Sequence, residues 1–145
     1  MGQARELMDR ATEAVFAREL DALREIYAPD VVVSTPDEGV LHGVDAFIDY
    51  MRQMTEAFPD MSYEMTRMHE AGDCAIDQGD VIATNTGPLA MPNGTSLPAT
   101  GKQVRLRTID VATVENGRIS RHDFYFDQME MLVQLGVLKE IAATV

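Results

Sequence analysis

The sequence predicts an α+β fold, and three observations support this prediction. Before residue 59, apolar residues recur every three or four positions in three stretches, which is the period of amphipathic helices. From residue 61 the period changes to two, as in half-buried strands, and a helical period returns near the C-terminus. Helices that are segregated from a long-stranded antiparallel sheet define the α+β class. No repeat or linker divides the 145 residues, so one domain is expected over residues 1–145.

The N-terminal part is expected to be mainly helical. Residues 4–15 form a first amphipathic stripe, and residues 20–27 form a short second one that Pro29 stops. The β-branched residues 31–35 predict a strand. A third helix is predicted over residues 44–58, again followed by a proline. His42, between this strand and this helix, is expected to be a loop or cap residue.

The C-terminal part is expected to contain a four-stranded meander and a final helix. The strands are predicted at Met61–Ala71, Asp73–Thr86, Lys102–Val114 and Ile119–Phe126. Residues 87–101 contain three prolines and are either a protruding hairpin or a lid over a cavity, with the hairpin favoured. The last helix carries Met129, Leu132, Leu135, Leu138 and Ile141, with a break at Gly136.

Composition excludes several classes of function. Twelve Lys and Arg against 24 Asp and Glu give a formal charge of −12, which opposes binding to nucleic acid or to anionic lipid. The sequence has no apolar run of membrane-spanning length, and its polar start is unlike a signal peptide. Cys74 is the only cysteine, so no internal disulfide forms, and the three histidines lack the spacing of a metal motif. A cytoplasmic location and no metal site are therefore predicted.

Charge assigns the faces of the last two strands. Between residues 104 and 114 the odd positions include Arg105 and Arg107, which are costly to bury, so the even face points inward and takes Asp110 with it. In residues 119–126 the odd positions carry charge, whereas the even ones include His122 and aromatic residues. A buried carboxylate and a buried imidazole on adjacent strands are natural partners.

The register of this hairpin decides whether the two side chains meet. A two-residue Asn116-Gly117 turn pairs Glu115 with Arg118 and places Asp110 on the same face as Asp123. A three-residue loop over residues 115–117, with Gly117 in a bulge, pairs even positions with even ones. The burial pattern favours the three-residue loop.

Five segments that are scattered along nearly the whole chain match a known family: residues 20–33, His42 to Phe47, Thr100 to Val104, Glu115 to Ile119, and residues 126–136. With these segments the chain resembles the SnoaL-like, polyketide cyclase-like family of the nuclear-transport-factor/ketosteroid-isomerase superfamily. The resemblance implies a cone-shaped, curved antiparallel sheet wrapped around N-terminal helices, in a cystatin-like or ketosteroid-isomerase-like α+β barrel. It also implies an apolar cavity, cofactor-free chemistry and dimers through the outer face of the sheet.

The family's catalytic residues transfer only in part. SnoaL-like cyclases close a ring by intramolecular aldol condensation with an aspartate on the last strand, and Phe124 stands at that position here. Asp110 falls where ketosteroid isomerases keep a protonated carboxyl group that donates to an oxyanion. Their tyrosine and their catalytic base fall at Ala11 and Thr35, which cannot replace them.

His122 and Asp110 are therefore the candidate catalytic residues. His122 could be a general base with Asp110 holding its tautomer, or Asp110 could be protonated and donate to an enolate. In a third interpretation the two residues simply satisfy each other in the core. The residues expected to line a substrate pocket are Tyr27, Phe47, Tyr50, Met51, Met54, Phe58, Asn85, Leu106, Thr108, Phe124 and Phe126. Tyr63 is a further residue that could orient a carbonyl oxygen.

Two functions from different classes fit the sequence. The first is a cofactor-independent cyclase or isomerase that acts on an apolar carbonyl compound through an enolate. The second is a non-catalytic ligand-binding or dimerisation domain that lacks the cyclase aspartate. A water-activating site like that of an epoxide hydrolase needs an Asp-Arg-Asp cluster in the pocket and ranks last. The expected partners are a small apolar ligand and a second copy of the chain, which would cover Ile109, Val111 and Tyr125 on the outer face.

Overall fold

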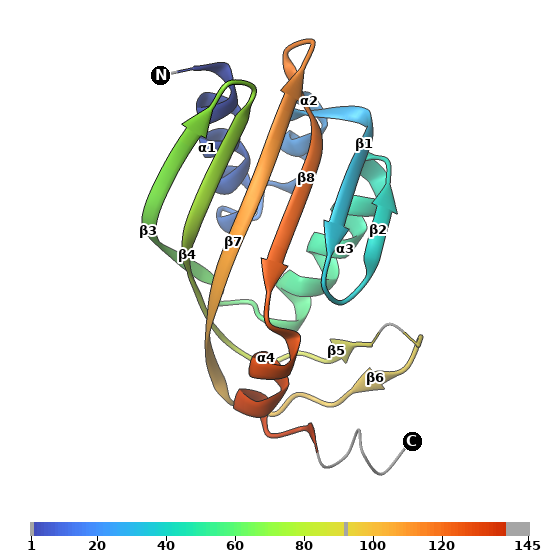
Figure 1. Ribbon diagram of the computed structural model, residues 1–145. Coiled ribbons are helices and arrows are strands. Elements are labelled where there is room, and N and C mark those ends of the chain that lie inside the picture. The colour runs from blue at the N-terminus through green and yellow to red at the C-terminus, as the bar shows by residue number, and fades with distance from the viewer. Residues whose placement is uncertain (1, 92, 139–145) are drawn as a thin grey trace.

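The computed structural model describes residues 2–91 and 93–138. A six-stranded sheet lies against helices α1, α2 and α3, and a small two-stranded sheet and α4 lie at one end (Figure 1). The elements in chain order are α1 (Gln3–Phe16), a 3-10 turn η1 (Leu20–Ala22), α2 (Leu23–Ile26), β1 (Tyr27–Thr35), β2 (Gly39–His42), α3 (Val44–Ala57), β3 (Ser62–Ala71), β4 (Cys74–Thr84), β5 (Leu89–Ala90), β6 (Ser96–Leu97), β7 (Gln103–Glu115), β8 (Arg118–Phe126) and α4 (Gln128–Leu135). The α+β class is confirmed.

The main sheet has the order β2-β1-β8-β7-β4-β3. The predicted sheet was antiparallel throughout, but β1 and β8 pair in parallel, so the sheet is mixed. It is also open, with β2 and β3 at its two edges, rather than a closed barrel. Strand β2 was missed because its four residues have no clear alternation, and His42 is the last residue of this strand instead of a loop or cap residue.

The second helix is shorter than predicted. It ends at Ile26, and Tyr27 already belongs to β1, where it pairs with Ile119 of β8. The register between β1 and β8 shifts after Tyr27, and this irregularity accommodates Pro29, which cannot donate a ladder hydrogen bond. Tyr27 therefore projects from the sheet and not from a helix.

The hairpin between β7 and β8 differs from the favoured prediction. The turn has two residues, Asn116 and Gly117, both with positive φ, and Glu115 pairs with Arg118. The bulge lies three residues later, since Ile119 pairs with Val114 but Arg121 pairs with Thr113, which leaves Ser120 as the extra residue. The predicted three-residue loop was thus wrong. The pairing that it was meant to explain is still observed, because after the bulge the even positions of both strands share the inner face from His122 onward.

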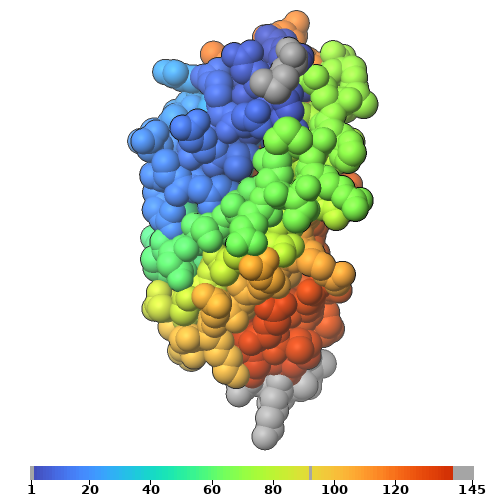
Figure 2. All heavy atoms as spheres, turned by 90° about the vertical axis from the view of Figure 1, so that its left-hand side faces the viewer, coloured from blue at the N-terminus to red at the C-terminus, as the bar shows by residue number. Residues whose placement is uncertain are grey.

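The inner face of the sheet and the helices enclose the core. The inward side chains of β1, β7 and β8 include Val31, Val33, Leu106, Ala112 and Ile119, all of them buried. Helix α1 packs across β3, β4, β7 and β8, and α3 packs against β1 and β2. The space-filling view shows α1 lying directly along β3 and β4 (Figure 2).

Helix α1 is capped by a residue far away in the sequence. Its N-cap Gly2 has no side chain, and Glu70 of β3 accepts hydrogen bonds from the backbone N–H groups of Gly2 (2.9 Å) and Arg5 (3.1 Å). These two hydrogen bonds lower the pKa of Glu70, and the bond from Gly2 has the larger effect. A Cβ on Gly2 would lie 2.5 Å from the Glu70 carboxylate, so the small residue makes this cap possible.

Helix α4 ends as its sequence predicts. Gly136 has a left-handed conformation at the C-cap, and Asp127 accepts from the Glu130 backbone N–H at the N-terminus. Ile141, which was predicted to continue the apolar stripe, lies outside the described residues.

Residues 87–101 contain the short β5-β6 hairpin, and none of its described residues lines the main cavity, so the favoured hairpin is observed and not a lid.

A buried ion pair joins α1 to the middle of the sheet. Two nitrogens of the Arg5 guanidinium lie 2.6 and 2.9 Å from the two carboxylate oxygens of Asp77 on β4, and the same guanidinium binds Asp9 one helical turn later. Arg5 and Asp77 are almost fully buried. Burial raises the pKa of Asp77, and the hydrogen bonds of Arg5 oppose this shift.

We expect Arg5→Met to lower the free energy of unfolding by about 3–5 kcal/mol, because it leaves Asp77 as an unpaired buried carboxylate. Chemical denaturation followed by circular dichroism measures this loss. The double variant Arg5→Met/Asp77→Leu should recover much of it, since both charges are then removed. Arg52→Met, which breaks the exposed pair with Asp49, is the control and should leave stability nearly unchanged. Equal losses for Arg5→Met and the double variant would show that the charge pairing is not the cause.

Candidate functional site

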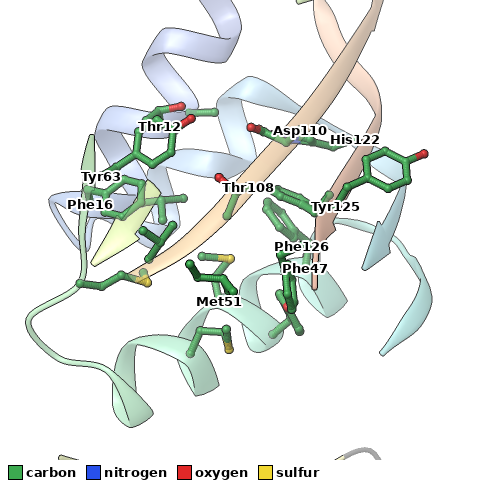
Figure 3. A pocket seen from close by; sticks show the side chains of 18 of the residues that line it. Thr12, Phe16, Phe47, Met51, Tyr63, Thr108, Asp110, His122, Tyr125 and Phe126 are labelled. Carbon is green, nitrogen blue, oxygen red and sulfur yellow. Dashed lines mark hydrogen bonds and ion pairs between the residues drawn. The ribbon is translucent and has the colours of Figure 1, made fainter. Parts of the chain in front are cut away.

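A cavity of about 130 Å³ lies between the inner face of the sheet and helices α1 and α3. Its lining is mostly apolar (Figure 3). Both candidate catalytic residues, Asp110 and His122, line it. Nine of the eleven residues predicted to line a pocket do so as well: Tyr27, Phe47, Tyr50, Met51, Met54, Leu106, Thr108, Phe124 and Phe126.

The other two predicted pocket residues lie elsewhere. Phe58 is buried at the C-terminus of α3 and belongs to the core. Asn85 is fully buried, and its side chain donates to the carbonyls of Ala57 and Gly87 and accepts from the backbone and hydroxyl of Thr100. All four hydrogen bonds of the Asn85 amide therefore join the segments after β4 and α3, and the Asn85 side chain has none left to orient a ligand.

Several lining residues were not predicted. They come from α1, from β4 and from the segment just before β3: Ala11, Thr12, Val15, Phe16, Met61 and Val81. Tyr63 of β3, which was expected to be able to orient a carbonyl oxygen, also lines the cavity. Phe16 of α1 stacks on Tyr63 of β3, with ring centroids 5.6 Å apart. Thr12 and Phe16 are four residues apart, so the helical period of α1 already indicated that they lie on one face of the helix. The packing of α1 against β3 was needed to show what that face contacts.

Tyr27, His122 and Asp110 form one hydrogen-bonded row. His122 Nε2 lies 2.7 Å from Asp110 Oδ2, and His122 Nδ1 lies 2.6 Å from the Tyr27 hydroxyl. The His122 side chain is 3% exposed and that of Asp110 is 14% exposed. The bulge at Ser120 places His122 diagonally across from Asp110 on the same face, which allows this contact.

The donors in this row can be assigned from chemistry. Burial, and secondarily the charge of Asp110, raise the pKa of Tyr27 well above its ordinary value, so Tyr27 stays protonated. Among the described residues His122 Nδ1 is the acceptor within reach of its O–H, so the Tyr27 hydroxyl donates the hydrogen bond. Nδ1 is then an acceptor, and the ring proton is on Nε2, where it is donated to the Asp110 carboxylate. His122 is therefore the neutral Nε2–H tautomer.

This assignment revises the expected division of roles. Both ring nitrogens of His122 are occupied by protein groups, so the imidazole has no free nitrogen to take a proton from a ligand. Asp110 uses Oδ2 for His122 and is the more exposed of the two. Of the two candidate residues, Asp110 is thus the one with a side-chain oxygen that is not bound to His122 and that could reach a ligand in the cavity.

Aromatic rings isolate this row from water. His122 stacks on Phe124 with centroids 4.0 Å apart, and Phe47 packs against both Phe124 and Tyr27. The arrangement suits proton transfer within an apolar ligand.

The structure also locates the charged residues that a water-activating site would need. Arg105 and Arg107 lie on the outer face, where they pair with Asp80 and Glu130. An Asp-Arg-Asp cluster exists around Arg5, but none of its members lines the cavity.

Within residues 2–91 and 93–138, no three His, Cys, Asp or Glu side chains are grouped so that they could hold a metal ion. No helix in the same ranges is long and apolar enough to cross a membrane.

Comparison with known proteins agrees with this architecture. The model of the SnoaL-like polyketide cyclase family matches residues 6–135, which is most of the chain. The chain belongs to this family. No match was found among curated protein sequences.

Solved structures similar to this SnoaL-like protein include one from Jannaschia sp. CCS1, described as a proposed SnoaL-like polyketide cyclase. It has a TM-score of 0.82 and 17% identity over 92% of this chain and 91% of that one. IdmH from Streptomyces antibioticus, a proposed polyketide cyclase, has a TM-score of 0.78 and 25% identity over 94% and 100% of the two chains. AclR from Streptomyces galilaeus, a proposed hydroxylase, has a TM-score of 0.77 and 22% identity over 93% and 96%.

We expect nitrogen-15 NMR of the SnoaL-like protein at pH 7 to show His122 as the Nε2–H tautomer, with Nδ1 unprotonated. In Tyr27→Phe, Nδ1 loses its donor and the free energy of unfolding should fall by about 1–3 kcal/mol, as for other buried groups left without a partner. His42, which is not buried, serves as an internal reference in the same spectra. A protonated Nδ1 on His122 in the wild-type protein would contradict the assignment.

Proposed function

We propose that this protein is a cofactor-independent enzyme that moves a proton next to the carbonyl group of an apolar ketone, and so promotes cyclisation or isomerisation through an enolate. The observation that carries the proposal is the Asp110 carboxylate, which borders an apolar cavity and is held on one oxygen by a buried neutral histidine. Family membership and the description of IdmH as a proposed polyketide cyclase support the same class of reaction.

The reaction can be written with this chain's own residues. Asp110 takes a proton from the carbon next to the ketone and becomes a carboxylic acid, and the substrate becomes an enolate. In a cyclisation, the enolate carbon attacks a second carbonyl of the same molecule, a carbon–carbon bond forms, and the resulting alkoxide takes the proton back from Asp110. In an isomerisation, the proton returns to a different carbon. Asp110 ends as a carboxylate in both cases, so no oxidant or reductant is consumed.

His122 and Tyr27 act on Asp110 and not on the substrate. Their hydrogen bonds fix the orientation of the carboxylate and leave its second oxygen for the ligand. The stacked rings of Phe47 and Phe124 exclude water from the enolate, which would otherwise be protonated by solvent.

A ligand-binding role without catalysis is the second candidate. It is favoured by Phe124, which by resemblance stands where SnoaL-like cyclases keep their aspartate. Under this alternative the cavity binds the same apolar ligands, but Asp110 and His122 serve only to satisfy each other. The two candidates differ in whether the protein exchanges protons with a bound ketone.

Deuterium exchange tests the proposal without knowledge of the natural substrate. Aryl ketones such as 2-acetonaphthone and 2-tetralone are incubated with protein in deuterated buffer, and incorporation next to the carbonyl is followed by NMR. We expect the wild-type protein to accelerate exchange, and Asp110→Asn to lower the rate by about 100-fold or more, because a general base contributes at least that factor.

The matched control is Asp123→Asn. Asp123 lies on the outer side of β8, where it binds Ser34 and Arg121, and its loss should leave exchange unchanged. If the wild-type protein exchanges no faster than buffer, or if Asp110→Asn matches wild type, the enzyme proposal fails and the binding role takes its place.

We also propose that the protein forms a homodimer through the outer face of the sheet. Ile109 and Tyr125 are cross-strand neighbours there, and they are 39% and 56% exposed. Two large apolar side chains at the centre of a sheet face favour a second protein surface as their cover.

We expect Ile109→Glu or Tyr125→Glu to convert the dimer into a monomer, since the charge would be buried without a partner at the interface. Sedimentation velocity measures the change. Met68→Glu is the control, because Met68 is similarly exposed but lies on the edge strand β3. A wild-type monomer at micromolar concentration, or dimers that persist in both variants, would overturn the proposed interface.

A further inference from the structure

Through its described lining residues, the cavity offers a ligand a hydrogen-bond acceptor but no side-chain donor. The acceptor is Asp110, which binds His122 through Oδ2 and has no hydrogen bond from its other oxygen to the residues that the structure describes. The Asp110 side chain is partly exposed, and neither of its oxygens is among the fully buried atoms without a partner. A carboxylate accepts hydrogen bonds and donates none. The second oxygen of Asp110 is therefore an acceptor that a ligand can reach.

The donors of the other polar lining residues are already bound within the protein. These hydrogen bonds run from the Tyr27 hydroxyl to His122 Nδ1, from Tyr50 to Asp37, from Thr12 to the Met8 carbonyl, from Thr108 to the Gly79 carbonyl, and from His122 Nε2 to Asp110. Each of these five groups has one proton to donate in the assigned state, so none is left for a ligand.

The two remaining tyrosines are also unavailable. The Tyr63 oxygen is fully buried beside Thr108 and packs against Gly79, where a Cβ would lie 2.7 Å from it, so a ligand cannot reach this oxygen. Figure 3 shows the Tyr125 side chain pointing away from the other lining residues. Asp110 thus provides the one charged hydrogen-bonding group that the described lining residues leave to a ligand.

Aromatic residues next to Asp110 show where the rest of a ligand would lie. Phe124 is the direct cross-strand partner of Asp110 on the inner face, which places the two Cβ atoms about 5 Å apart. Phe47 stacks on Phe124 with ring centroids 5.8 Å apart, and Phe126 is the next residue of β8 on the same face. Figure 3 shows Asp110 above the rings of Phe47 and Phe126. A ligand that reaches Asp110 therefore places its apolar part against these rings.

This polarity distinguishes two kinds of ligand. A carbonyl or ether oxygen has only lone pairs, so at the Asp110 carboxylate it would bring two acceptors together without a hydrogen bond. A ketone can place only a C–H group there, as the proposed reaction requires. A phenol or an enol can place an O–H group there, and a hydrogen bond to an ionised acceptor is about twice as strong as one between neutral groups.

We propose that the cavity binds flat ring compounds that carry a hydroxyl group, namely phenols and cyclic enols, with the O–H donated to Asp110 and the ring against Phe47, Phe124 and Phe126. The ligand keeps its proton, so binding requires no reaction. The inference goes beyond the proposed function, because it applies to an enzyme and to a binding protein alike. It also means that the cavity favours the enol form of a bound ketone, since only the enol has a donor.

Two naphthalenes that differ in one donor test the polarity of the cavity. 2-Naphthol can donate and accept a hydrogen bond, whereas 2-methoxynaphthalene can only accept one. We expect the wild-type protein to bind 2-naphthol about tenfold more tightly in fluorescence titrations at neutral pH, where 2-naphthol keeps its proton.

Asp110→Asn should reverse this preference. The Nε2–H group of His122 needs an acceptor, so the amide oxygen turns toward His122 and the amide NH₂ group faces the cavity. The variant then offers a donor where the wild-type protein offers an acceptor. We expect it to bind 2-methoxynaphthalene more tightly than the wild-type protein does and 2-naphthol less tightly. A gain of affinity for one probe also excludes misfolding as the cause. Asp123→Asn on the outer side of β8 is the matched control and should keep the wild-type preference.

The inference fails if the wild-type protein binds the two probes equally, prefers the ether or binds neither, or if Asp110→Asn keeps the wild-type preference. These results are distinct from a failure of the proposed function. A protein that prefers 2-naphthol but does not exchange deuterium into ketones would retain this inference and overturn the enzyme proposal. Exchange that depends on Asp110, without a preference between the two probes, would do the reverse.

Discussion

One extra residue in β8 decides which side chains face the cavity. The tight turn at Asn116 and Gly117 sets a register that would turn Asp123 inward beside Asp110, where two carboxylates would repel each other. The bulge at Ser120 moves the rest of the strand by one position, so that His122 takes the inward place. The hydrogen bond from His122 to Asp110, the aromatic wall around it and the apolar outer face at Tyr125 all follow from this single shift.

The inner face of the sheet holds more charge than an apolar core usually contains, and it does so in two paired groups. Asp77 and Asp110 are direct cross-strand partners on β4 and β7, so each needs its own compensation. Arg5 of α1 neutralises the first, and His122 supports the second with a hydrogen bond. Helix α1, which Glu70 anchors to β3, is therefore an electrostatic part of the site as well as a wall of it.

The cavity separates groups that stabilise the fold from groups left for a ligand. The hydroxyls of Tyr27 and Tyr50 are hydrogen-bonded within the protein, whereas one carboxylate oxygen of Asp110 has no hydrogen bond to the residues that the structure describes. Unpaired polar groups are costly in an apolar enclosure, and proteins retain such groups mainly where function requires them. An unshared acceptor in an apolar space matches one need of the proposed enolate formation, which is a base for the proton.

The sequence by itself determined the α+β class, the inward face of β7 and the presence of His122 and Asp110 on that side, because alternation of apolar and charged residues depends only on the local pleat. It also predicted most of the apolar lining, since the three- and four-residue period of an amphipathic helix marks the cavity face of α3. The parallel pairing of β1 with β8, the site of the bulge and the contact of Tyr63 with Gly79 depended on tertiary structure. Each of these joins segments that are distant in the sequence or balances a local turn preference against burial of the whole strand. The hydrogen-bond pattern of the acid–imidazole pair also emerged only in three dimensions, because the partner of His122 Nδ1 is Tyr27, 95 residues away.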